Sequence, residues 1–142
     1  MKFAILATGT RGDIQPFVAL AQGFAAAGHE AVLAAPRAFE SFVRSYGVDF
    51  VPMGSDFTAL LESPEGKAAL RGNPIKTMQV VRQTVFPMMR RMLEDAWEAA
   101  QGADAIIYHP KALAGVHLAE RLQVPCFIGT PVPVVVPTAA FP

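Results

Sequence analysis

The hydrophobic positions of the chain form short continuous runs that alternate with segments of helical spacing. The first run covers residues 3–7, after which hydrophobic residues recur every three or four positions until Gly28. A continuous apolar run of this length favours a buried strand, and recurrence at three and four positions favours an amphipathic helix. Glycine directly after the last periodic residue is a typical helix end. The beginning of the chain therefore predicts a strand, a loop and a helix.

The same alternation continues to the end of the chain. Strands are predicted at residues 30–35, 48–53, 104–110 and 125–130, and helices at residues 39–46, 75–101 and 112–122. Pro87 should kink or divide the long middle helix, because proline lacks a backbone N–H. Residues 57–73 predict a short helix within a loop, and the proline-rich residues 131–142 predict an extended loop.

Strands and helices in alternation predict the α/β class, as a Rossmann-like doubly wound parallel sheet with helices on both faces. The 142 residues fit a single domain. In such sheets, ligands bind beyond the carboxyl ends of the strands. The loop after the first strand, His109 after the fourth and residues 129–133 after the fifth are therefore expected to meet at one edge.

Composition and charge exclude several functions. The chain has 12 basic and 12 acidic residues, which predicts no binding of nucleic acid. Hydrophobic residues make up 52% and charged residues 17%, so part of the apolar content is expected to face a ligand or a partner. The absence of a long apolar stretch and of a signal peptide predicts a cytoplasmic protein with no transmembrane segment. The single cysteine, Cys126, excludes an internal disulfide and a cysteine metal cluster.

Residues 7–16, with the sequence ATGTRGDIQP, contain more polar groups than a strand-to-helix connection needs. Their spacing, Gly9-x-x-Gly12, matches neither the G-x-G-x-x-G dinucleotide motif nor a P-loop. Asp13 is expected to be the N-cap of the following helix or to take part in chemistry, with Pro16 in the first helical turn. The helix N-terminus should lower the pKa of Asp13, and burial by a bound substrate should raise it again.

Two longer stretches resemble a known enzyme family. They are GTRGDIQPFVALAQGFAAAGHEAVLAAP and GVHLAERLQVPCFIGTPVPVVVPTAAFP. Both are similar to the N-terminal, acceptor-binding domain of GT-B fold glycosyltransferases, in the branch that contains sterol glucosyltransferases and antibiotic (glycopeptide and macrolide) glycosyltransferases. The resemblance covers most of residues 1–142 and is weakest at 57–75. It implies that the chain is a single acceptor-binding domain and that a C-terminal nucleotide-sugar-binding domain is absent from it.

The resemblance also implies a reaction. It is the inverting transfer of a sugar, of the hexosyltransferase type, from a nucleotide diphosphate sugar to a hydroxyl of a hydrophobic acceptor such as a sterol, a lipid or a natural-product aglycone. A base must take the proton of that hydroxyl, and the position that matches the family's base is Asp13. The resemblance implies no metal and no cofactor besides the nucleotide sugar, which is a co-substrate. The chain alone is expected to be inactive, because the main donor site would lie in the absent domain.

Other residues are candidates for binding the two substrates. Thr10, Arg11 and Gly12 are assigned to the donor, since amides at a helix N-terminus bind phosphate. Thr10 and Arg11 could instead brace the loop, and Arg11 could be a surface residue. The resembled family tends to carry a histidine at the position of His117, which is assigned to the donor side or the domain interface.

The acceptor candidates share apolar character or a position after a strand, and they are Phe57, Met78, Phe86, Met89, His109 and Val132. Methionine suits an adaptable apolar pocket, although the methionines of the long helix would serve equally to pack it onto the sheet. His109 could orient the acceptor, help Asp13 hold a proton or be a hydrogen-bonded structural histidine.

Two other functions remain open. The chain could be a non-catalytic acceptor-binding subunit that works with a separate catalytic partner, which its natural length would reveal. A flavodoxin-like mononucleotide binder is a third interpretation, and an absorbance spectrum would test it.

Overall fold

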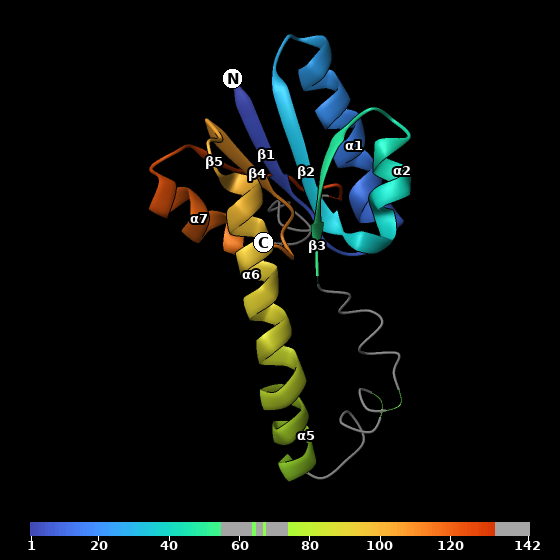
Figure 1. Ribbon diagram of the computed structural model, residues 1–142, viewed down its shortest axis with the longest axis vertical. Helices are drawn as coiled ribbons and strands as arrows, with labels where there is room; N and C mark the ends of the chain where they lie inside the picture. Colours follow the sequence, from blue (N-terminus) through green and yellow to red (C-terminus); the bar gives the residue numbers. More distant parts are fainter. Residues whose placement is uncertain (55–63, 65–66, 68–73, 133–142) are drawn as a thin grey trace, which may run out of the picture.

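The computed structural model describes residues 1–54, 64, 67 and 74–132. Within this part of the chain, one parallel sheet has the strand order β3-β2-β1-β4-β5 (Figure 1). The strands are β1 (Lys2–Leu6), β2 (Glu30–Pro36), β3 (Asp49–Met53), β4 (Ala105–Tyr108) and β5 (Cys126–Ile128). The chain builds the sheet outward from β1 in one direction and then crosses to β4 on the other side. This order confirms the predicted Rossmann-like, doubly wound sheet.

Helices cover both faces of the sheet (Figure 1). α1 (Arg11–Ala26) and α2 (Glu40–Arg44) pack on the face that includes Ile5 and Leu33. α6 (Phe86–Ala100) and α7 (Ala114–Leu122) pack on the face that includes Leu6 and Ala34. Neighbouring strand residues thus enter opposite cores, which explains why the strands are continuous apolar runs without alternation.

The beginning of α1 differs from the sequence prediction. Its N-cap is Thr10 and Asp13 is the third helical residue, so the prediction of Asp13 as the N-cap is wrong. Asp13 instead reaches back, and its Oδ2 accepts a hydrogen bond from the Thr10 backbone N–H at 2.7 Å. Because the helix begins at Arg11, Pro16 lies in the second turn and cannot donate to the carbonyl of Gly12.

The predicted long helix is divided as expected from Pro87. α5 (Pro74–Val80) is followed by a π-helical turn, η2 (Val81–Val85), and then by α6, in which Pro87 is near the beginning. Proline has no N–H for the carbonyl four residues earlier, which accounts for a wider turn directly before it. A 3-10 turn, η1 (Arg37–Phe39), precedes α2. Apart from Pro64 and Lys67, the short helix predicted at 57–73 lies outside the described residues, as do residues 133–142.

No helix in the described ranges is long and apolar enough to cross a membrane.

Candidate active site at the carboxyl edge of the sheet

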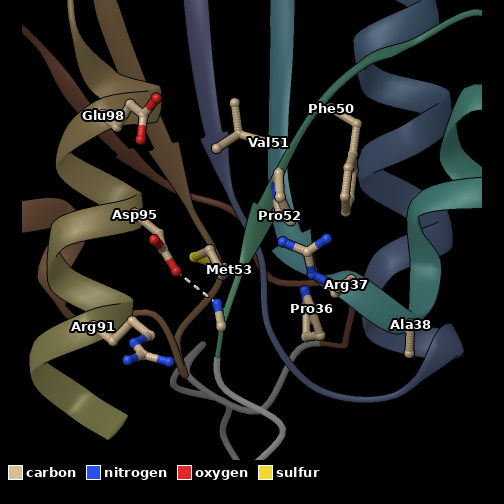
Figure 2. A pocket seen from close by; sticks show the side chains of 11 residues that line it. Pro36, Arg37, Ala38, Phe50, Val51, Pro52, Met53, Arg91, Asp95 and Glu98 are labelled. Atoms are coloured by element: carbon tan, nitrogen blue, oxygen red, sulfur yellow. Dashed lines mark hydrogen bonds between the residues drawn. The ribbon is translucent and has the colours of Figure 1, made fainter. Parts of the chain in front are cut away.

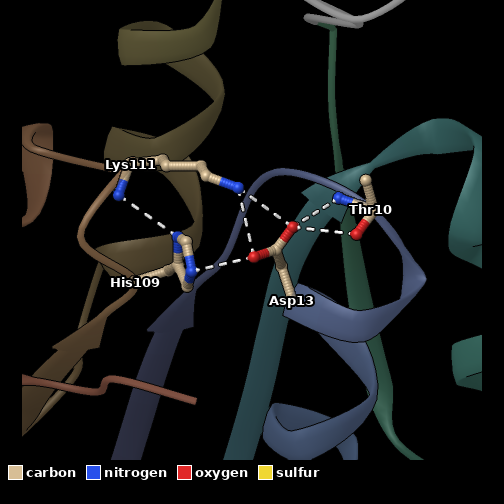
Figure 3. A network of polar contacts seen from close by, with 4 residues as sticks. All are labelled: Thr10, Asp13, His109 and Lys111. Carbon is tan, nitrogen blue, oxygen red and sulfur yellow. Dashed lines mark hydrogen bonds and ion pairs between the residues drawn. The ribbon is translucent and has the colours of Figure 1, made fainter. Parts of the chain in front are cut away.

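The candidate site forms where β1 and β4 end side by side. The register pairs Leu6 with Tyr108, and the His109 backbone N–H donates to the Leu6 carbonyl at 2.8 Å. The segments that follow the two strands therefore leave the sheet together. One brings Thr10 and Asp13, and the other brings His109 and Lys111 (Figure 3).

Three residues contact the carboxylate of Asp13 (Figure 3). The Thr10 backbone N–H and hydroxyl donate to Oδ2 at 2.7 and 3.0 Å. Lys111 Nζ lies 3.1 Å from both Oδ1 and Oδ2. His109 Nε2 lies 3.3 Å from Oδ1. The Asp13 side chain is 19% exposed, so the carboxylate is largely enclosed but still accessible.

Gly9 makes room for this carboxylate. Its φ is +129°, a conformation that side chains rarely adopt, and a Cβ atom there would collide with Oδ2 of Asp13 and lie 2.7 Å from Cγ. A glycine at this position therefore lets the loop backbone pass directly against the charged group.

The geometry of His109 fixes its tautomer. Nδ1 accepts a hydrogen bond from the Lys111 backbone N–H at 3.1 Å, which assigns the ring proton to Nε2, the atom that faces Asp13. The imidazole also packs against the ring of Phe17 in a T-shaped contact, with ring centroids 6.0 Å apart and an interplanar angle of 83°. The imidazole is buried and both of its nitrogens have protein partners. His109 therefore has no free ring nitrogen in this structure and lies against the Asp13 carboxylate.

The site favours an aspartate anion beside a neutral histidine. Burial raises the pKa of Asp13, but the hydrogen bonds from Thr10 and the hydrogen bond and charge of Lys111 outweigh it, so the pKa lies below its ordinary value. Burial lowers the pKa of His109, and the charge of Lys111 adds to this effect against the opposing attraction of Asp13. The lowered pKa of Asp13 was predicted from its place at the helix N-terminus. The contribution of Lys111 was not.

Lys111 is the residue of this cluster that sequence reasoning missed. It lies two positions after His109, in the segment Tyr108-His109-Pro110-Lys111. Its position directly after a strand, at the edge of the sheet where ligands are expected to bind, was the sequence feature that could have identified it.

The residues assigned to the donor lie in two places. Thr10 contacts Asp13 directly, which fits its predicted bracing role. The guanidinium of Arg11 lies 4.6 Å from the centre of the Phe42 ring, in a cation–π contact with α2. Gly12 is exposed in the first turn of α1. His117 lies on α7 with a side chain that is 82% exposed, which shows that it is not a core histidine. Their donor-binding roles stay predictions.

Four of the residues assigned to the acceptor lie on segments other than those that carry the Asp13 cluster. Met78, Phe86 and Met89 are exposed along α5 and α6, and Val132 is exposed after β5. Met78 lines a hollow of about 760 Å³ formed by α5 and η2. His109 is the acceptor candidate that the fold brings to Asp13, and Phe57 lies outside the described residues.

A larger pocket lies between α6 and the ends of β2 and β3 (Figure 2). Its volume is about 910 Å³, within the size range of ligand pockets. One wall is apolar and the rim is charged; the lining residues are Pro36, Arg37, Ala38, Phe50, Val51, Pro52, Met53, Gly54, Arg91, Asp95 and Glu98. Asp95 Oδ2 accepts a hydrogen bond from the Gly54 backbone N–H at 2.6 Å, which ties α6 to the end of β3. None of the acceptor residues predicted on the long helix lines this pocket.

Comparison with known proteins agrees with the fold and the motif. A sterol 3-beta-glucosyltransferase from Eremothecium gossypii is 36% identical over 125 residues, which cover 88% of this chain and 10% of that protein. Among solved structures, SsfS6, a glycosyltransferase from Streptomyces sp. SF2575, superposes with a TM-score of 0.66 at 22% identity, over 92% of this chain and 39% of that chain. SnogD from Streptomyces nogalater superposes with a TM-score of 0.66 at 23% identity, over 94% and 33% of the two chains.

These matches confirm the predicted branch of sterol and antibiotic glycosyltransferases. The chain spans about a tenth of the length of the curated relatives it matches. The family description "Glycosyltransferase family 28 N-terminal domain" matches residues 3–141, nearly the whole sequence. The chain therefore belongs to this family of glycosyltransferase N-terminal domains.

Proposed function

We propose that residues 1–142 form the acceptor-binding domain of an inverting glycosyltransferase, with Asp13 as the general base. The enzyme transfers a sugar from a nucleotide diphosphate sugar to a hydroxyl of a hydrophobic small molecule. A separate nucleotide-sugar-binding domain, outside this chain, supplies most of the donor site. The observation that carries the proposal is the partly exposed Asp13 carboxylate at the carboxyl edge of the sheet, in a chain of this family.

The reaction requires one proton transfer and one displacement at carbon. As the acceptor hydroxyl oxygen attacks the anomeric carbon, its proton passes to a carboxylate oxygen of Asp13. The bond between the anomeric carbon and the diphosphate oxygen breaks, and its electron pair leaves with the nucleoside diphosphate. Asp13 is suited to receive the proton because it is ionised at neutral pH and remains 19% exposed.

Two observations favour Asp13 over His109 as the base. Nδ1 of His109 already accepts a hydrogen bond from Lys111, and Nε2 carries the proton that faces Asp13. The imidazole is also buried, so an acceptor hydroxyl has no open nitrogen to approach. In the proposed mechanism, His109 holds the Asp13 carboxylate in position through Oδ1 and leaves the exchange of the proton to Asp13.

The acceptor is proposed to bind in the pocket between α6 and β3. Pro36 and Met53 lie at the carboxyl ends of their strands, at the same sheet edge as Asp13. Val51 and Pro52, which are partly exposed in the pocket lining, suit a hydrophobic molecule, and Arg37 and Arg91 on the rim suit its polar substituents. The name of the matched relatives, sterol 3-beta-glucosyltransferase, supports a large apolar acceptor.

The donor is proposed to meet this domain at the beginning of α1. Gly12 is exposed in the first turn of α1, and a helix N-terminus attracts a diphosphate. One solved relative, SsfS6, has been determined in complex with thymidine diphosphate, which supports a nucleotide donor for the family.

The experiment that tests this function measures acceptor-dependent release of nucleoside diphosphate by the native-length protein. A panel of nucleotide sugars is combined with sterols and other lipophilic alcohols, and the wild type is compared with Asp13→Asn. The variant should lose about 100-fold or more in kcat, since a general base contributes about that much. Asp49→Asn, at the exposed start of β3, is the matched control and should retain full activity.

The other outcomes separate the alternatives. Equal transfer by wild type and a folded Asp13→Asn variant would refute Asp13 as the base and keep the enzyme. No transfer by the wild type from any nucleotide sugar would refute the proposed reaction and favour the non-catalytic acceptor-binding subunit.

A further inference from the structure

Lys111 holds the base by an ion pair that faces solvent. Its Nζ lies 3.1 Å from each oxygen of Asp13, and its side chain is 59% exposed. Its backbone is anchored separately, because the Lys111 N–H donates to Nδ1 of His109. The ammonium can therefore leave Asp13 by rotation of the flexible stem, without disturbing the orientation of the histidine.

The other partners of Asp13 are not free to leave. Thr10 belongs to the same helix start and contacts Oδ2 through both its backbone and its hydroxyl. His109 is buried and held on both sides of its ring. Among the described partners of Asp13, Lys111 alone combines a long side chain with exposure. Lys111 is therefore the partner that an approaching acceptor hydroxyl can displace.

The ion pair also opposes the chemistry proposed for Asp13. An ammonium beside a carboxylate stabilises the charged form and makes it a poorer base. The base must gain a proton in the transition state, and the attraction to Lys111 would be lost at that moment. The observed pairing therefore belongs to the protein without its substrates, and in the bound state the exposed ammonium is available to another partner.

The geometry of the reaction supplies that partner. The acceptor oxygen must be within about 3 Å of Asp13 and within roughly 3–3.5 Å of the anomeric carbon, to which the diphosphate oxygen is bonded. The diphosphate thus lies only two short contacts away from Asp13, within the range over which a lysine side chain can swing. Negative charge grows on this group as the bond to the sugar breaks.

We infer that Lys111 exchanges the Asp13 carboxylate for the diphosphate of the nucleotide sugar when the donor binds. This exchange rests on the proposed glycosyl transfer. Donor binding would then free the Asp13 carboxylate from Lys111 and at the same time place the Lys111 ammonium beside the diphosphate leaving group. Lys111 would couple the two substrates, so that Asp13 becomes an effective base only when a sugar is present to receive the acceptor oxygen.

The first test measures binding of uridine diphosphate and thymidine diphosphate to the native-length protein by calorimetry. Lys111→Met should weaken the binding about tenfold, as expected for loss of a charge-assisted hydrogen bond, and Lys111→Arg should stay within about threefold of wild type. Arg90→Met is the matched control, because it also removes one exposed positive charge, and it should bind as wild type. Wild-type affinity in a folded Lys111→Met variant would overturn the inference.

A second test measures the competition between Asp13 and the diphosphate for Lys111. Asp13→Asn should strengthen nucleoside diphosphate binding, because it frees the ammonium and removes a negative charge. The same change in the Lys111→Met background removes only the negative charge, so the gain should be at least about threefold smaller. Equal gains in both backgrounds would refute the exchange.

Sugar transfer by the same proteins separates this inference from the proposed function. If wild type transfers sugar and Asp13→Asn does not, but Lys111→Met keeps its affinity for nucleoside diphosphate, the exchange alone is wrong. If wild type transfers nothing, the proposed function fails as well. If the exchange is correct, Lys111→Met raises KM for the donor and leaves KM for the acceptor nearly unchanged.

Discussion

Gly9 and Asp13 are in direct contact at the centre of the candidate site. The Gly9 backbone has a φ of +129°, and the space that a side chain would occupy there is filled by the Asp13 carboxylate. The loop conformation and the position of the charged group are therefore one structural feature.

Gly9→Ala should damage this feature. The new methyl group must displace Asp13 or change the backbone at Gly9, at a cost of about 1–3 kcal/mol in the free energy of unfolding. Urea denaturation of the native-length protein measures the loss. Gly23→Ala is the control, because nothing lies within 4 Å of its added Cβ inside α1. It should stabilise the protein by up to about 1 kcal/mol, and equal effects of the two substitutions would contradict the contact.

Lys111→Met should raise the pKa of Asp13. The substitution removes a hydrogen bond and a positive charge that both lower this pKa, while burial continues to raise it. The titration is followed by the carboxyl ¹³C resonance of Asp13 in the absence of nucleotide. Lys111→Arg keeps the charge and should leave the pKa lowered. A pKa that does not change in Lys111→Met would show that the ion pair does not form in solution.

Acidification should destabilise the fold in part through His109. Burial lowers the pKa of this histidine in the folded state, so below its ordinary value of 6.5 the unfolded chain binds the proton more readily. Stability should therefore fall as the pH drops from 7 to 5. His109→Asn removes the titrating group, and its free energy of unfolding should decline less over this range. Parallel declines in the two proteins, followed by urea denaturation at each pH, would assign the effect to other groups.

Below pH 5, protonation of Asp13 should lower the free energy of unfolding further. Its folded pKa is lowered, so its contribution is complete above the pKa of the unfolded carboxyl, about 3.9, and disappears as the pH falls through the folded pKa.

Ala38→Trp should weaken acceptor binding if the pocket beside β3 holds the acceptor. Ala38 is exposed and lines that pocket, so a larger side chain narrows it at little cost to the fold. KM for the acceptor should rise about tenfold or more, with KM for the donor nearly unchanged. Ala25→Trp, at an exposed position of α1 that does not line the pocket, is the control. An unaltered acceptor KM in a folded Ala38→Trp variant would remove the pocket from consideration.

Much of the fold could be predicted from local patterns. Buried strands such as residues 3–7 are continuous apolar runs because both sheet faces are covered, and this property is visible without any knowledge of neighbours. Gly47 lies in the turn that follows α2 and has a φ of +71°, a conformation that glycine adopts readily, so its place near a helix end was visible from the sequence. The start of α1 could not be placed correctly, because Thr10 and Asp13 are both acceptable N-caps and the fit of Asp13 against Gly9 decided between them.

The sequence by itself determined the parallel α/β class, the family motif from Gly9 to Pro16, and Asp13 as the residue of interest. It also placed His109 at the same sheet edge as Asp13. Only the tertiary structure showed that His109 and Lys111 both contact the Asp13 carboxylate, although Lys111 is 98 positions away. They reach Asp13 because β4 pairs with β1, and hydrophobic periodicity carries no information about which strands pair. The protonated nitrogen of His109 follows from the Lys111 N–H that donates to Nδ1, and the lowered pKa of Asp13 follows from its contacts with Thr10 and Lys111.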